Sequence, residues 1–268
     1  MYNDLTLEQR VISIVKETAL IIRNARFDII EKDGSANIVT TSDLMSQERL
    51  VKQLKELIPE SGFLCEENDL KDTSKEYTWV IDPIDGTANY ARGINDSCIS
   101  VGLLHNRKCV LGVVCNIFLD EVYSATIDLG ARLNGKAINV SKRSFSEGIL
   151  CTAMSLYKKD LAKKCSDIIY EAYMQCNDVR RFGSCALELC YLASGKCDLF
   201  FEIRVFPWDY TGAYLVLNEA GGMLKGFNNQ KLTFDKTTVL IGANNLNNFE
   251  KLNEIISKHL NEGDVCYE

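Results

Sequence analysis

Residues 79–90 read WVIDPIDGTANY, and this stretch joins a strand to a helix through two carboxylates. Trp79-Val80-Ile81 is an apolar run typical of a buried strand, and Asp82 ends it. Pro83 keeps the residue before it extended, whereas Asp85-Gly86-Thr87 has the composition of a helix start. Free amides at a helix start attract anions, so the stretch offers two carboxylates suited to a divalent metal beside a place suited to phosphate.

Two further acidic sites lie at the ends of predicted elements. Glu66-Glu67 follows the strand-like GFLC, and Asp209 opens a helix directly after FPW. For an isolated Asp-x-x-Asp-Gly motif the favoured interpretation is a capped turn, with Asp85 as the helix cap and Asp82 solvated. Acidic groups at three such places favour a different interpretation, in which they form a cage for more than one divalent ion.

The first part of the chain predicts helices and strands in alternation. Thr6 and Gln9 have capping-box spacing, and apolar residues at helical spacing predict a helix to about Arg26. Residues 36–43 read ANIVTTSD, which predicts a strand that ends at Asp43. The apolar spacing from Leu50 onward predicts a second helix, which Pro59 stops. Short strands are expected at 62–68 and 77–82.

The middle and the end of the chain differ in pattern. Residues 98–140 predict an antiparallel meander with turns at HNRK, LDE and Asn134-Gly135, and its apolar strands indicate a sheet covered on both faces. Beyond it, helices alternate with short strands, so the chain is a mixed α/β (α+β) protein. We expect a single domain over 1–268 with two lobes that meet near 141–147. The predicted helices span 155–173, 186–194, 209–222 and 247–260, and the predicted strands span 197–203 and 238–245.

Composition narrows the class of protein and the kind of chemistry. The net charge of −7 and the lack of long basic runs argue against nucleic acid as a partner, although a local basic spot can still meet one phosphate. No segment has the ~20 apolar residues that a membrane span needs, and the N-terminus is unlike a signal peptide, so we expect a cytoplasmic protein without a membrane partner. The eleven cysteines lie in apolar runs without C-x-x-C spacing, which favours reduced, structural thiols. With only His105 and His259 present, carboxylates are the better candidates for the chemistry.

Three segments, GFLCEEN, WVIDPIDGTANYARG and PWDYTGAYLVLNEAGG, resemble the inositol monophosphatase family of Mg²⁺-dependent, lithium-sensitive phosphatases. The match covers nearly the whole chain in the family's order and spacing. The resemblance implies a layered αβαβα sandwich of the inositol monophosphatase and fructose-1,6-bisphosphatase type. It also implies a homodimer with two to three Mg²⁺ ions per site.

The resemblance assigns roles to single residues. Glu66, Asp82 and the carbonyl group of Ile84 match ligands of a first metal. Asp82, Asp85 and Asp209 match those of a second, and Glu66 also serves a weaker third. Thr87, Asp43 and Glu66 match the catalytic groups that orient the attacking water and accept its proton. The implied substrate-binding positions are Lys32, Asp85, Gly86, Thr87, Gly183, Ser184, Cys185 and Glu202.

The implied activity is the Mg²⁺-dependent hydrolysis of a small polyol or sugar phosphate, foremost myo-inositol monophosphate, without a covalent phosphoenzyme. The same fold also acts on fructose 1,6-bisphosphate, 3′-phosphoadenosine 5′-phosphate and histidinol phosphate. A remote alternative is a non-catalytic regulator that binds metal and phosphate. Two departures border the substrate and not the metals: Cys185 in the Gly183–Cys185 segment, and Arg204 and Phe206 within EIRVFPWD.

Overall fold

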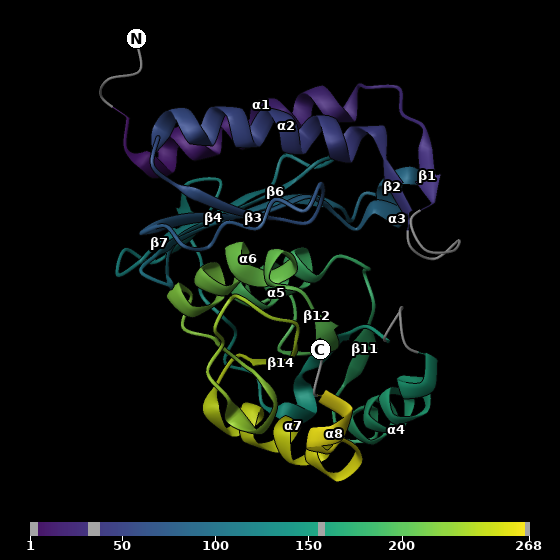
Figure 1. Ribbon diagram of the computed structural model, residues 1–268. Coiled ribbons are helices and arrows are strands. Elements are labelled where there is room, and N and C mark those ends of the chain that lie inside the picture. The colour runs from purple at the N-terminus through teal and green to yellow at the C-terminus, as the bar shows by residue number, and fades with distance from the viewer. Residues whose placement is uncertain (1–4, 32–37, 155–158, 266–268) are drawn as a thin grey trace.

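The computed structural model describes residues 5–31, 38–154 and 159–265. Helices and sheets alternate in five layers, αβαβα, from one end of the molecule to the other (Figure 1). Helices α1 and α2 form the first layer, α5 and α6 the third, and α4, α7 and α8 the fifth. The helices are α1 (Leu7–Arg23), α2 (Thr41–Leu57), α3 (Thr87–Ala91), α4 (Ala162–Tyr173), α5 (Cys185–Ala193), α6 (Pro207–Glu219), α7 (Leu246–His259) and α8 (Glu262–Val265), with short 3₁₀ turns at Phe145–Glu147, Lys159–Leu161 and Phe227–Asn229.

The second layer is a seven-stranded sheet in the order β3-β4-β5-β6-β7-β8-β9. Strands β3 and β4 run parallel, and every later neighbour pair is antiparallel, so the meander expected over 98–140 is confirmed. Helices cover both faces of this sheet, as its apolar strands predict (Figure 1). Its strands are β3 (Gly62–Cys65), β4 (Tyr77–Asp85), β5 (Cys98–His105), β6 (Lys108–Asn116), β7 (Val122–Thr126), β8 (Ala131–Leu133) and β9 (Lys136–Ala137).

The fourth layer is a five-stranded sheet in the order β11-β10-β12-β14-β13. Strand β10 lies parallel to β11 and β12, and β14 pairs antiparallel with β12 and β13. The short β1 and β2 form a separate antiparallel pair. The bounds of these strands are β1 (Ile29–Glu31), β2 (Ile38–Thr40), β10 (Ile149–Thr152), β11 (Asp178–Arg180), β12 (Leu199–Val205), β13 (Met223–Lys225) and β14 (Thr238–Ala243).

The start of α2 differs from the sequence prediction. The strand expected to reach Asp43 ends at Thr40, and residues 41–43 already form the first turn of α2. The Asp43 carboxylate accepts a hydrogen bond from the Thr40 amide at 2.7 Å, and Thr40 Oγ1 accepts one from the Ser42 amide at 3.2 Å. This capping box satisfies free amides at the helix start, so the helix begins about two and a half turns earlier than the apolar spacing indicated.

The end of β4 also differs from the prediction. The strand continues past Asp82 to Asp85, and its register with β5 shifts between these two residues. Pro83 has no amide proton to donate to a ladder, and a bulge is one of the places where a sheet accepts proline. The predicted helix over 155–173 includes residues 155–158, which lie outside the described residues, and its described part is a 3₁₀ turn followed by α4.

Three expectations from composition can be compared with the structure. All ten cysteines in the described part of the chain are free thiols, and nine of them are buried, which confirms the structural interpretation. His105 and His259 lie at the surface and contact Glu76 and Glu171 through their imidazole rings. No helix in the described residues has the length and apolarity that crossing a membrane requires.

Helix α6 packs against the first sheet at unusually short range because glycines face each other. A Cβ atom on Gly112 of β6 would lie 2.1 Å from the carbonyl oxygen of Gly212, and one on Gly102 of β5 would lie 2.6 Å from the Thr211 side chain. The first turn of α6 also carries Asp209, so this packing fixes where that carboxylate lies.

We therefore predict that Gly112→Ala destabilises the protein by at least about 3 kcal/mol, because α6 must move away from the sheet to admit the methyl group. Gly226→Ala is the control, since its Cβ would meet only ordinary or slightly tight contacts of 3.3 Å and beyond, and it should cost less than about 1 kcal/mol. Urea unfolding curves measure both values. Equal stability of the two variants would show that α6 can shift freely.

Candidate active site

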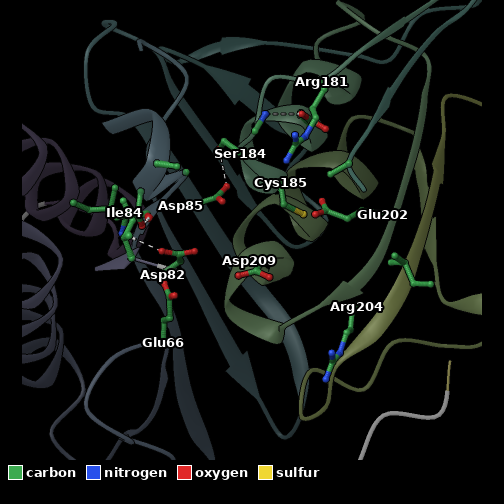
Figure 2. A pocket seen from close by; sticks show the side chains of 18 residues that line it. Glu66, Asp82, Ile84, Asp85, Arg181, Ser184, Cys185, Glu202, Arg204 and Asp209 are labelled. Atoms are coloured by element: carbon green, nitrogen blue, oxygen red, sulfur yellow. Dashed lines mark hydrogen bonds between the residues drawn. The ribbon is translucent and has the colours of Figure 1, made fainter. Parts of the chain in front are cut away.

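One pocket collects nearly all of the site residues predicted from the sequence. It lies where the ends of β3 and β4 and the start of α3 face the first turns of α5 and α6 and the strand β12. In Figure 2, Glu66, Asp82 and Asp85 lie on one side, Ser184, Cys185 and Glu202 on the other, and Asp209 between them. The cavity has a volume of about 140 Å³, and its lining is Ile38, Glu66, Asp82, Ile84, Asp85, Gly86, Thr87, Ala88, Ala153, Arg181, Gly183, Ser184, Cys185, Glu188, Glu202, Ile203, Arg204 and Asp209.

The chain fixes three of the carboxylates by hydrogen bonds. Asp82 Oδ1 accepts from the Ile84 amide at 3.0 Å, which stabilises the bulge in β4. Asp85 Oδ2 accepts from the Ser184 hydroxyl at 2.6 Å and from the Ala186 amide at 2.7 Å. Asp209 Oδ2 accepts from the Phe206 amide at 2.8 Å, as a carboxylate does in the first turn of a helix. These bonds leave the acidic groups directed at one shared space (Figure 2).

Burial and like charge raise the pKa of these groups. Burial raises the pKa of Asp82 well above its ordinary value, and the negative charges of Glu66 and Asp85 raise it further. Burial also raises the pKa of Asp209 well above its ordinary value, and the negative charge of Asp85 raises it further. Burial also raises the pKa of Asp85 to about 6, against the lowering effect of its hydrogen bonds to Ser184 and Ala186. A group of buried like charges that repel one another favours the binding of a cation.

The donor set fits a hard divalent cation. Every candidate ligand is oxygen, which Mg²⁺ prefers, and the described cysteines and histidines supply none of them. In residues 5–31, 38–154 and 159–265, no three carboxylate, thiol or imidazole groups already converge as a closed metal cage. The carboxylates expected to form a metal cage thus line one pocket, but in the described residues no three of them lie close enough together to hold an ion, and the cage stays a prediction. The Ile84 carbonyl oxygen, another predicted ligand, accepts a hydrogen bond from Thr87 at 3.0 Å and keeps a second lone pair.

Asp43 reaches the pocket through Thr87. The Thr87 hydroxyl lies 3.1 Å from Asp43 Oδ1 and 3.0 Å from the Ile84 carbonyl oxygen, and its single proton can serve one of them at a time. Thr40 donates to the other carboxylate oxygen of Asp43 from both its amide and its hydroxyl. Burial raises the pKa of Asp43 to about 6, although these hydrogen bonds lower it. The pair is therefore present as expected, and its catalytic role stays a prediction.

The opposite wall carries the predicted substrate contacts. Gly183, Ser184 and Cys185 form the turn into α5, and Gly183 has a left-handed φ of +86°. Burial, followed by the charge of Glu202, raises the pKa of Cys185 well above its ordinary value, which argues against a reactive thiolate. Burial and the charge of Asp85 raise the pKa of Glu202 to about 7. Lys32 lies outside the described residues.

Two charged lining residues, Glu188 and Arg181, were missed by the sequence reasoning. Glu188 lies one helical turn after Ser184 in α5, so helical periodicity from the Gly183–Cys185 segment would have indicated it. Arg204, noted in the sequence as a departure, lines the pocket from a bulge in β12 with φ +68°, a conformation that favours glycine. Such backbone strain in a non-glycine residue is found most often at functional sites.

Comparison with known proteins now decides the family. The family model described as the inositol monophosphatase family matches residues 2–261. The chain belongs to this family. It is 33% identical over 244 residues to inositol monophosphatase 2 of Solanum lycopersicum, which covers 87% of this chain and 91% of that protein. It is also 35% identical over 215 residues to Nus factor SuhB of Xylella fastidiosa, with 79% and 74% of the two chains covered.

Solved structures of inositol monophosphatases have the same fold as this chain. The inositol monophosphatase of Anabaena superposes with a TM-score of 0.81 at 28% identity, over 96% of this chain and 99% of the other. The Thermotoga maritima enzyme gives a TM-score of 0.82 at 27% identity, over 92% and 95% of the two chains. The expected αβαβα fold is thereby confirmed. The family is one of metal-dependent phosphatases, which agrees with the oxygen-rich acidic pocket.

The raised pKa of Glu202 predicts how stability depends on pH. The folded protein keeps this proton up to about pH 7, whereas the unfolded chain releases it near its ordinary value of 4.5. Between these values only the folded state holds the proton, so the free energy of unfolding falls as the pH rises. For the metal-free protein we expect Glu202→Gln to reduce this fall by on the order of 2 kcal/mol between pH 4.5 and 7, since an amide does not titrate.

Urea unfolding in the presence of a chelator measures this difference. Glu250→Gln on the exposed side of α7 is the control and should follow the native protein. A Glu202→Gln variant that shows the native pH dependence would contradict the assignment.

Proposed function

We propose that this protein hydrolyses a phosphate monoester of a small polyol or sugar, with myo-inositol monophosphate as the foremost substrate. The observation that carries the proposal is the pocket that places the Asp43–Thr87 hydrogen bond beside a group of carboxylates, of which Asp82 and Asp85 are buried. Family membership supports the phosphatase class.

The proposed mechanism assigns a task to each part of the pocket. Glu66, Asp82, Asp85, Asp209 and the Ile84 carbonyl would hold two to three Mg²⁺ ions, which supply the charge that neutralises the phosphate and acidifies the attacking water. The Thr87 hydroxyl, held by Asp43, orients that water, and a neighbouring carboxylate such as Glu66 takes its proton. The amides of Gly86 and Thr87 at the start of α3 would bind phosphoryl oxygens.

The opposite wall would recognise the alcohol part of the substrate. Glu202 accepts or donates hydrogen bonds to a substrate hydroxyl, and the turn of Gly183, Ser184 and Cys185 shapes the wall beside it. We retain fructose 1,6-bisphosphate, 3′-phosphoadenosine 5′-phosphate and histidinol phosphate as alternative substrates. We also propose that the chain works as one catalytic domain over 1–268, in a homodimer, on a small phosphorylated substrate without nucleic acid.

A second candidate function follows from the relatives named Nus factor SuhB, which are 32–35% identical to this chain. In it the protein would act as a non-catalytic regulator that binds metal and phosphate and contacts a macromolecular partner. The carboxylates of the pocket and the Asp43–Thr87 pair favour catalysis. Turnover of any substrate by the purified protein separates the two candidates.

A phosphate-release screen over these substrates tests the proposal. We expect turnover with added Mg²⁺, none after exhaustive chelation, and inhibition by lithium at millimolar concentration or below. The physical reason is the all-oxygen donor set, which lacks the thiolates and imidazoles that retain zinc. Full activity after chelation would refute the metal-dependent reaction.

Exchanging single carboxylates separates the two walls of the pocket. Asp209→Asn keeps the size of the side chain and removes the negative charge assigned to a metal, so turnover should fall by about a hundredfold or more. Glu202→Gln should instead change the ranking of kcat/KM among substrates more than the turnover of the best one. Circular dichroism checks that both variants are folded. An active Asp209→Asn protein and a Glu202→Gln protein dead towards every substrate would reverse the assignment.

A further inference from the structure

Glu188 is a buried carboxylate in the pocket wall that the proposed reaction leaves without a task. It lies in α5 with 1% of its surface exposed. Its Oε1 atom accepts hydrogen bonds from the amides of Phe182, at 2.6 Å, and Gly183, at 3.0 Å. Its Oε2 atom has no hydrogen-bond partner in the described part of the chain. A buried polar atom without a partner costs about 1–3 kcal/mol, so its presence in the pocket wall calls for a reason.

The two amides that Glu188 binds belong to the turn that enters α5. The turn is constrained from a second side, because the Asn89 side chain of α3 donates to the Phe182 carbonyl oxygen at 2.6 Å. Gly183 adopts φ +86°, and its carbonyl oxygen would lie only 3.1 Å from a Cβ atom on Gly86. The turn therefore lies directly against the start of α3. Even a small displacement of the turn towards α3 would bring it into collision with backbone atoms.

The same turn carries the donor that fixes Asp85. Ser184, the next residue after Gly183, donates from its hydroxyl to Asp85 Oδ2 at 2.6 Å, and the Ala186 amide donates to the same atom at 2.7 Å. A chain of direct contacts thus runs from Glu188 through two backbone amides to Ser184 and on to Asp85. Asp85 is one of the carboxylates proposed to hold Mg²⁺, so a shift of the turn would move a ligand.

We propose that Glu188 is a positioning residue, which holds the Phe182–Ser184 turn so that Ser184 fixes Asp85 on one side and Cys185 shapes the substrate wall on the other. This inference rests on the proposed function for its kinetic consequences. Glu188 touches neither the reacting atoms nor the ion, and it acts through the turn. Burial, followed by the charge of Glu202, raises the pKa of Glu188 to about 8, which agrees with a group that serves as a fixed acceptor at neutral pH.

The chain offers a matched control for this proposal. Glu219, at the end of α6, also accepts hydrogen bonds from two backbone amides of one turn, those of Asp128 at 2.9 Å and Gly130 at 2.8 Å. That turn follows β7, and none of these residues lines the catalytic pocket. Glu188→Met and Glu219→Met therefore each remove a side chain that accepts from two backbone amides, the first buried at the site and the second half-buried away from it.

Three measurements on the full chain compare these variants with Glu188→Gln, which keeps an acceptor oxygen for the two amides. They are the Kd for Mg²⁺ from calorimetry without substrate, the KM and kcat for phosphate release, and the hydrogen exchange of the amides of residues 182–186. For Glu188→Met we expect a Kd weakened about fivefold, a KM raised about tenfold and faster exchange. Glu188→Gln should stay within about twofold of the native protein in all three. Glu219→Met should lose stability while it keeps the native Kd and KM.

A double substitution tests the contact chain itself. Ser184→Ala should weaken Mg²⁺ binding about as much as Glu188→Met does, and the two together should be no worse than either alone. If Glu188→Met does not fold, Glu188→Asp replaces it, because its shorter side chain keeps the carboxyl group but does not reach both amides. Additive effects of the pair, or identical behaviour of the Glu188→Met and Glu219→Met proteins, would overturn the proposal.

Failure of the positioning role of Glu188 can be distinguished from failure of the proposed function. If the native protein releases phosphate from no substrate, the proposed function fails. Hydrogen exchange at residues 182–186 still decides whether Glu188 holds the turn, and Mg²⁺ affinity decides whether the turn holds a ligand. Amide hydrogen exchange at the native rate in the Glu188→Met protein would contradict the positioning role even if the enzyme proves to be an active phosphatase.

Discussion

The arrangement of the site depends on one constraint, the electrostatic repulsion among the carboxylates of the pocket. Asp82, Asp85 and Asp209 face one cavity with Glu66, and burial raises the pKa of the three aspartates, with like charge raising that of Asp82 and Asp209 further. Two unit charges 4 Å apart repel by about 4 kcal/mol at an effective dielectric constant of 20. A fold that holds several such groups together must fix each of them firmly, and it gains stability from any cation that neutralises them.

The scaffold fixes these groups from separate layers. The first sheet supplies Asp82 and Asp85 at the bulged end of β4, and the third layer supplies Asp209 from the first turn of α6. The close glycine contacts of α6 with β5 and β6 prevent this helix from sliding along the sheet. The hydrogen bonds from Ser184 and Ala186 to Asp85 span about a hundred residues of sequence and connect α5 to the end of β4. The pocket is thus formed by packing between layers, and the positions of its carboxylates depend on the stability of the whole fold.

The wall opposite the carboxylates carries the polar residues that the sequence pattern did not assign to the metal. Cys185, Glu188 and Arg204 line it, and each combines burial or backbone strain with a polar group. The environment of Cys185 and Arg204 is set by α5 and by the bulge in β12, whereas Glu188 contacts the turn that leads to Ser184 and Asp85. Substitutions at Cys185 and Arg204 are therefore expected to affect the alcohol side of the pocket, and substitutions at Glu188 to affect both sides.

The sequence by itself determined the elements with a strong local pattern and the acidic residues of the site. The meander over 98–140, the capping box at Thr6 and the Asp82–Thr87 motif all depend on neighbours within a few residues, so local periodicity and turn chemistry reveal them. The family resemblance likewise rests on short motifs in a fixed order.

The start of α2 at Thr41 is local too, because the capping bonds of Thr40 and Asp43 span only three residues. Only the tertiary structure decided the continuation of β4 to Asp85 and the unpartnered Oε2 atom of Glu188, since a bulge needs a partner strand and this atom lacks a partner only in its packed surroundings. These features arise from contacts between segments that lie far apart in the chain, and a local pattern carries no record of them.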